Sequence, residues 1–164
     1  AAVVVKQVFQ NSAESLGIML GTYSLGAAIG SISLSSGLIR IRGGVLIVCS
    51  SFIWHVSAAL VSLAPSTSVS LPIFFSAGIG TSMCVIMIST MILNLTPSNL
   101  RGRIMGLRQL AVGGLPLGLL LSGAITELAG VQVALVFNGI MGSLMTIGVC
   151  LLWPQMVRSQ STKS

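Results

Sequence analysis

The sequence predicts an all-α protein, a polytopic bundle of transmembrane helices, and three observations support this fold class. Of the 164 residues, 54% are hydrophobic and 6% are charged, whereas a soluble domain carries about 25% charged residues. The mean hydropathy is +1.02. The apolar stretches are longer than the strands of a membrane barrel and lack their alternation. This composition excludes a soluble enzyme, a disordered tail and a secreted disulfide scaffold.

Long stretches without charged side chains define the predicted helices in order. They are residues 15–39, 43–100, 109–126 and 128–157, and a helix needs about 20 residues to cross about 30 Å of hydrocarbon. The second stretch holds two spans, because a polar turn follows Pro65 and Pro72 suits the first turn of the next helix. Five spans are therefore predicted, near residues 17–37, 44–64, 71–94, 106–127 and 131–153.

The basic residues predict the orientation in the membrane. One side carries seven of the eight, namely Arg40, Arg42, Arg101, Arg103, Arg108, Arg158 and Lys163, and Lys6 lies on the other. By the positive-inside rule the first side is cytoplasmic, so the N-terminus is extracytoplasmic and the C-terminus is cytoplasmic in a cell (inner) membrane. The net charge of +6 then signals topology and not a nucleic-acid partner.

The same pattern divides the chain into three parts. Residues 1–16 are expected to be the extracytoplasmic end of a preceding helix and its loop. Residues 17–153 are the five-helix transmembrane part, and residues 154–164 are a cytoplasmic tail. The sequence begins without an initiator Met, so we expect a fragment of a longer protein.

Small residues mark the expected contact faces, because helices in lipid associate by close backbone approach. In the first span Gly26 and Gly30 lie beside a longer stripe, which comprises Gly17, Gly21, Ser24, Ala28 and Ser31. In the fourth span the stripe comprises Gly114, Gly118 and Ser122. Pro116 lies within it and is expected to bend this helix near Gly113. The bent helix is either a moving part of a transporter or simply a closely packed helix.

Polar residues at membrane depth are the candidate functional residues. They are Tyr23, His55, Ser82, Ser89, Thr90, Asn94, Gln109 and Asn138, and no Asp, Glu, Lys or Arg lies in the middle of a span. His55 is either an ion-coupling residue or a neutral imidazole bonded to a neighbouring helix. Catalytic, phosphate-binding and metal-binding motifs are absent from the sequence, and the three cysteines lie in apolar spans. We therefore expect no enzyme activity, no cofactor and no metal.

Two motifs resemble the major facilitator superfamily of permeases. Residues 96–106 read TPSNLRGRIMG, and residues 107–118 read LRQLAVGGLPLG. They are similar to the P-x-x-L-R-G-R-x-M-G loop and the G-G-x-x-P-x-G bend in the branch of the enterobactin exporter and the macrolide efflux proteins. Residues 122–135 resemble the turn into the last helix of that family. Gly26 to Gly30, with Arg40 and Arg42, resembles its eighth helix and following loop, without the acid that this loop usually carries.

The resemblance implies that the chain corresponds to helices eight to twelve, in the C-terminal half of a twelve-helix transporter. It implies secondary-active efflux of a small organic molecule, of drug or siderophore type, by alternating access with the missing N-terminal half. Such a transporter would be an antiporter, with a proton as its coupling ion. Tyr23, Ser82, Ser89 and Gln109 would lie near the cavity and His55 farther from it.

The arginines of the first motif are candidate gate residues at the cytoplasmic side. The motif residues are Arg40, Arg101, Gly102, Arg103 and Gly106. A guanidinium there would bind either carbonyls at a helix C-terminus or an acid of the other half. The alternative is that they are topology anchors in contact with membrane lipid. Two other functions stay open, the membrane subunit of an ATP-driven permease and a non-transporting membrane scaffold.

Overall fold

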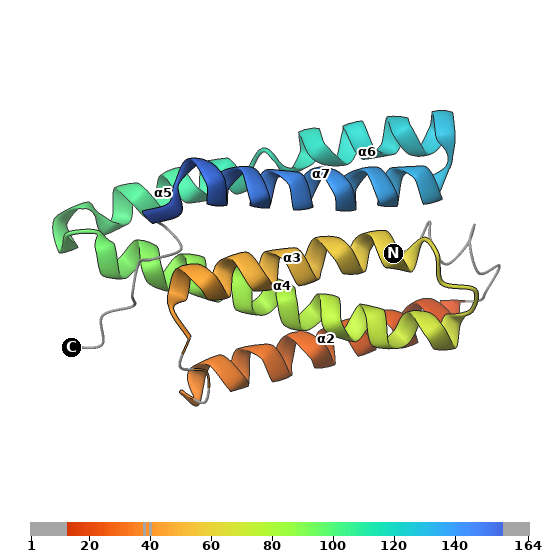
Figure 1. Ribbon diagram of the computed structural model, residues 1–164, viewed down its shortest axis with the longest axis horizontal. Helices are drawn as coiled ribbons and strands as arrows, with labels where there is room; N and C mark the ends of the chain where they lie inside the picture. The colour runs from red at the N-terminus through yellow and green to blue at the C-terminus, as the bar shows by residue number, and fades with distance from the viewer. Residues whose placement is uncertain (1–12, 38, 40, 156–164) are drawn as a thin grey trace.

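The structure, a computed structural model, describes residues 13–155 except 38 and 40, and this part of the chain is helical without strands (Figure 1). The elements are α2 (Ala13–Ser35), α3 (Gly43–Val61), α4 (Thr67–Leu95), the 3-10 turn η1 (Ser98–Leu100), α5 (Arg101–Val112), α6 (Leu115–Ala129) and α7 (Val131–Leu152). Five stretches are long and apolar enough to cross a membrane, with η1, α5 and α6 together forming the fourth. The all-α fold class with five spans is confirmed.

The helices form a row in which each packs mainly on its neighbours. α2 packs on α4, α4 on α3, α3 on α7 and α7 on α6. In Figure 1, α2 lies at one edge of the bundle and α6 at the other, and successive spans run in opposite directions. Arg42, before α3, and Arg101, at the start of α5, therefore lie at one end of the bundle, whereas Glu14 and Glu127 lie at the other. We refer to these as the basic end and the acidic end.

Glycines bring α2 and α4 into backbone contact. A Cβ on Gly78 of α4 would overlap the carbonyl oxygen of Tyr23, and one on Gly26 of α2 would overlap that of Phe75. Gly30 meets Ser82 and Ile79 in the same way. The contact face of α2 thus comprises Tyr23, Gly26, Ala27 and Gly30, which follow the i, i+3, i+4, i+7 spacing of one helix face.

The longer stripe of small residues on α2 is not the face that packs on α4. Gly17 and Gly21 have no atom within 4 Å of an added Cβ, and Ser24 and Ala28 are exposed. Both faces of α2 are rich in small residues, so spacing alone could not distinguish them. The opposing glycine, Gly78, decides which face meets α4.

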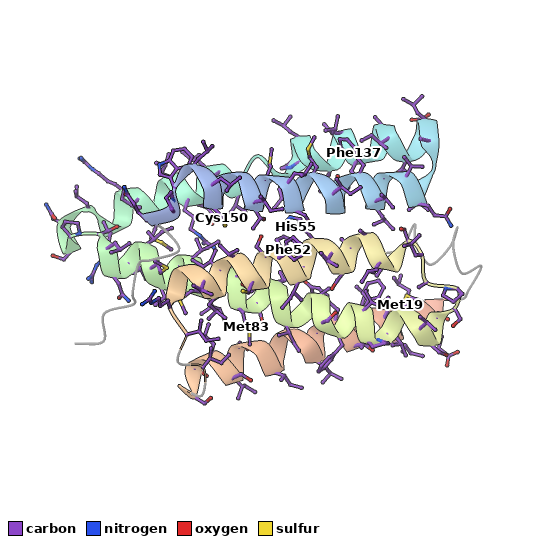
Figure 2. The ribbon with its side chains drawn as sticks, in the orientation of Figure 1. Met19, Phe52, His55, Met83, Phe137 and Cys150 are labelled. Carbon is purple, nitrogen blue, oxygen red and sulfur yellow. The ribbon has the colours of Figure 1, made fainter. Side chains whose placement is uncertain are left out.

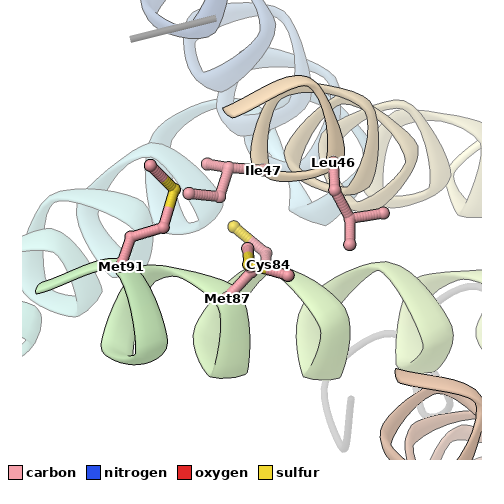
Figure 3. Close-up of a cluster of buried hydrophobic side chains, with 5 residues drawn as sticks. All are labelled: Leu46, Ile47, Cys84, Met87 and Met91. Carbon is pink, nitrogen blue, oxygen red and sulfur yellow. The ribbon is translucent and has the colours of Figure 1, made fainter. Parts of the chain in front are cut away.

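Two apolar clusters fill the centre of the row. The cluster near the basic end comprises Leu46, Ile47, Cys84, Met87 and Met91, from α3 and α4 (Figure 3). Near the acidic end Val61 of α3 meets Val131 of α7, with Ile73, Phe74 and Leu135 packed around them. These clusters make α3, α4 and one end of α7 a continuous body.

Three helices begin at least four residues earlier than the sequence predicts, and the first of them is α2, which starts at Ala13 and not near 17. α4 starts at Thr67 because Ser66 caps it, with the Ser66 hydroxyl accepting a bond from the Val69 N–H at 3.4 Å. Pro72 consequently lies inside α4 and not in its first turn. The first α-helix of the fourth span, α5, starts at Arg101 and not near 106, so residues 101–106 of the expected loop lie in the first turns of α5.

Candidate functional site

The junction between α4 and α5 holds the arginine motif. α4 ends where Thr96 adopts an extended conformation before Pro97, because the residue before a proline is disfavoured in the helical region. η1 then reverses the chain, with the Leu100 N–H bonded to the Pro97 carbonyl at 2.9 Å. Arg101 donates through Nε to the Thr96 carbonyl at 3.2 Å. The guanidinium thus binds an exposed carbonyl at the C-terminus of α4, which is one of the two partners expected from the sequence.

The other motif residues make no comparable contact. Arg103 is exposed, and an added Cβ on Gly102 or Gly106 would meet no atom within 4 Å. Arg103 has no hydrogen bond or ion pair with another described residue. Arg40 lies outside the described residues. Among the motif residues that the structure describes, Arg101 is therefore the one with a specific side-chain contact.

The fourth span is interrupted in its middle. α5 ends at Val112 and α6 begins at Leu115, with Gly113 and Gly114 between them. Pro116 lies in the first turn of α6, where it has no N–H to donate to Val112. The Gly114 N–H bonds instead to the Ala111 carbonyl at 3.2 Å, a tighter turn than an α-helix has.

The small residues around this break have no partner helix within the described chain. An added Cβ on Gly114 would meet only the carbonyl of Ala111 in the preceding turn, and one on Gly118 would meet nothing within 4 Å. No residue of α5 or α6 is buried. The interrupted span is therefore attached to the bundle mainly through the contact of α6 with α7.

The four candidate cavity residues lie in different surroundings. Tyr23 and Ser82 lie along the α2–α4 interface, where Ser82 contacts Gly30. Ser89 lies two turns farther along α4, and Gln109 is exposed on α5. The hydroxyl of Ser82 donates to the Ile79 carbonyl at 3.1 Å and that of Ser89 to the Val85 carbonyl at 2.7 Å. The structure thus brings Tyr23 and Ser82 to one interface, and it brings Gln109 to neither of the two serines.

His55 belongs to a polar network between α3 and α7, and Figure 2 shows its side chain between these helices. Its Nδ1 lies 2.7 Å from the Ser51 carbonyl oxygen, a geometry that requires the proton on Nδ1. The Ser51 hydroxyl lies 3.1 Å from that of Thr146, which in turn donates to the Gly142 carbonyl at 2.8 Å. The imidazole occupies the place that a side chain on Gly142 would take.

The imidazole lies at a helix interface, but it bonds to Ser51 of its own helix, whereas the structural interpretation of His55 expects a bond to the neighbouring helix; Ser51 makes the contact with α7. The sequence analysis missed this network of Ser51, Gly142 and Thr146 around the ring. The spacing of Ser51 and His55 by one helical turn was an available signal, but the contribution of α7 depends on which helices are neighbours. Among the described residues no group of His, Cys, Asp and Glu could hold a metal ion.

A second polar contact joins α6 to α7. Asn138 donates through Nδ2 to the hydroxyl oxygen of Ser122 at 2.8 Å. A shallow apolar groove of about 400 Å³ lies on the other side of α7, and it is lined by Ser62, Leu63, Gln132, Val133, Val136, Phe137 and Ile140. None of the candidate cavity residues lines this groove.

Comparisons with known proteins agree with this architecture. The profile of the Major Facilitator Superfamily matches residues 1–164. No curated protein and no solved structure gives a significant match. Five membrane-length helices and a family match over the whole sequence make this a multi-pass membrane protein, and the chain belongs to the major facilitator superfamily of transporters.

Proposed function

We propose that the chain is part of a secondary-active exporter of small organic molecules of drug or siderophore type, which works by alternating access. The observation that carries the proposal is the family match over residues 1–164. Secondary transporters built from two repeated halves carry their substrates across the membrane as the halves rock about a central binding site. The enterobactin and macrolide exporter branch, suggested by the TPSNLRGRIMG motif, supplies the direction and the substrate type.

Two features of the structure support a working mechanism. The break at Gly113 and Gly114 divides the fourth span into a half near the basic end and a half attached to α7. Arg101 links the start of α5 to the end of α4 through the Thr96 carbonyl. We infer that this bond holds α5 against the end of α4 at a cytoplasmic gate in one state, and that the break absorbs the change of angle when α5 moves relative to the bundle.

We propose that the basic end is cytoplasmic and that the N-terminal half of the transporter packs against this chain in the inner membrane. Single-cysteine labelling by an impermeant reagent, in a cysteine-free version of the full-length protein, tests the orientation. Ser68 and Ala129 should be labelled from outside intact cells. Outside labelling at Arg42 or Arg101 contradicts the orientation.

A transport assay tests the function itself. The full-length protein, reconstituted into sealed vesicles, should move cationic dyes and siderophore analogues against a gradient when a proton gradient is imposed. A protonophore should abolish this transport, and ATP without an ion gradient should not restore it. Transport that requires ATP alone would favour a subunit of an ATP-driven permease. Lack of transport of any probe by correctly inserted protein would favour a scaffold.

A further inference from the structure

The hairpin of α6 and α7 is the least densely packed helix pair of the row. Gly130 joins the two helices with φ of +88°, a conformation that glycine adopts without strain. α6 contributes only one face to the contact, and its half-buried residues are Ser122, Ile125 and Thr126. No glycine of α6 approaches α7 within 4 Å of an added Cβ. Close backbone contact therefore does not hold α6 in place.

The hydrogen bond from Asn138 to Ser122 lies at the middle of this contact. Both residues are eight positions from Gly130, or about 12 Å along each helix axis. At that depth an amide without a partner is costly, because hydrocarbon offers no hydrogen bonds. The Ser122 oxygen supplies the partner at 2.8 Å. Separation of α6 from α7 would leave the amide of Asn138 without it.

α7 itself is firmly attached to α3. Gly139 lets the backbones approach so closely that an added Cβ would lie 2.7 Å from the His55 carbonyl oxygen. The Ser51 and Thr146 hydroxyls bond across the same interface. On the other side of the break, α5 contacts mainly η1 and α4. α7 therefore connects α6, to which it is bound through Asn138, with the body of the bundle.

We propose that Asn138 is a positioning residue for transport, which keeps α6 fixed to α7, and through α7 to the bundle, so that bending at Gly113 and Gly114 moves α5 alone. The inference rests on the proposed transport function. Asn138 does not contact the substrate in this proposal, because it acts through Ser122 and the position of α6. Loss of the amide should let α6 separate from α7, so that bending at Gly113 and Gly114 moves α6 as well as α5 and the motion of α5 at the basic end becomes smaller.

Distance measurements by pulsed electron paramagnetic resonance test whether α5 moves while α6 stays fixed to α7. Spin labels are placed on exposed positions of α5, α6 and α7, at Leu107, Leu120 and Leu144, in full-length protein in lipid nanodiscs with its cysteines replaced. In the parental protein the α6–α7 distance should stay narrow with and without a substrate analogue, whereas the α5–α7 distance should change. An α6–α7 distance that changes as much as the α5–α7 distance overturns the proposal.

Substitutions then identify the amide as the cause. Asn138→Leu should increase the fraction of separated α6 by about 3- to 20-fold, the range expected from interhelical hydrogen bonds in membranes. Gln132→Leu is the matched control, because it removes an exposed amide from the same helix that has no bonded partner in the described chain. The exchanged pair Ser122→Asn with Asn138→Ser should restore the narrow distribution. A narrow distribution in Asn138→Leu overturns the proposal.

Transport kinetics separate this inference from the proposed function. Asn138→Leu should lower kcat by several-fold with KM unchanged, and Gln132→Leu should leave both unchanged. Equal losses of kcat in the two variants, or an unchanged kcat in Asn138→Leu despite separated helices, overturn the positioning role. Absence of transport by the parental protein contradicts the proposed function, while the distance measurements still judge whether Asn138 holds α6.

Discussion

The α2–α4 and α6–α7 pairs show two ways in which helices associate in this chain. Gly26, Gly30 and Gly78 place the backbones of α2 and α4 in direct contact. α6 has no buried residue, and one side-chain hydrogen bond crosses its contact with α7. Because apolar side chains gain nothing by leaving lipid for protein, close packing is the main attraction between spans. The first pair is therefore a fixed joint, and the second is a weaker one.

The two prolines within spans show the same contrast. Pro72 lies inside α4, which stays a continuous helix from Thr67 to Leu95. Pro116 follows two glycines in a span without buried residues, and that span is broken. A proline removes one backbone hydrogen bond in either place. Packing on both α2 and α3 holds α4 together around its proline, whereas α5 and α6 lack such support.

The largest expected effect is a loss of stability at the α2–α4 contact. Gly78→Ala places a Cβ against the backbone of Tyr23, which cannot move aside without moving α2. We expect a destabilisation of about 3 kcal/mol. Gly118→Ala, the control in α6, meets open space and should change stability by less than about 0.5 kcal/mol. Thermal unfolding in detergent measures both, and equal effects would remove the contrast between the two pairs.

The next effect concerns the break. Pro116→Ala restores an N–H that can bond to the Val112 carbonyl, and it favours a continuous helix by up to about 3 kcal/mol. We expect the distance between labels at Leu107 and Leu120 to become longer and transport to fall about tenfold. Pro72→Ala should leave transport unchanged, because α4 is already continuous. Full transport by Pro116→Ala would show that the break does not bend during the cycle.

A smaller effect is expected at the α3–α7 contact. Gly142→Ala forces the His55 ring out of its place, at a cost of about 1 to 2 kcal/mol. A side chain can move more easily than a backbone, so this cost should be lower than that of Gly78→Ala. Combining it with His55→Ala should recover most of the loss. A thermal shift that is simply the sum of the two single changes would mean that the ring does not occupy the site.

The smallest effect separates the two motif arginines. Arg101→Gln removes the charge-assisted bond to Thr96 at the end of α4, which is worth about 0.3 to 1 kcal/mol at an exposed helix terminus. Transport should fall two- to fivefold with membrane insertion intact. Arg103→Gln should have less effect, since Arg103 contacts no described partner. Equal efflux in both variants would leave them as topology anchors.

The sequence predicted the spans well because charge and hydropathy act locally. All five spans, and the position of the Arg42 and Arg101 segments at a common end, followed from the spacing of charges. Contact faces were less predictable, because α2 carries small residues on two faces and only Gly78 of α4 selects between them. The Ser51–Thr146 contact beside His55 and the bond from Asn138 to Ser122 join residues of different helices, so they depend on neighbours that one-dimensional spacing does not reveal.

Most of the serine and threonine hydroxyls in the spans donate their proton to a carbonyl of the preceding turn, as Ser82, Ser89 and Thr90 do along α4. Each hydroxyl has one proton, so its remaining capacity is as an acceptor. A ligand lying against this stretch of α4 would meet lone pairs and apolar carbon, without a carboxylate and with few groups able to donate. That chemistry suits molecules rich in N–H and O–H groups. It disfavours anions, because the oxygen lone pairs along this stretch of α4 provide no positive charge to balance an anion.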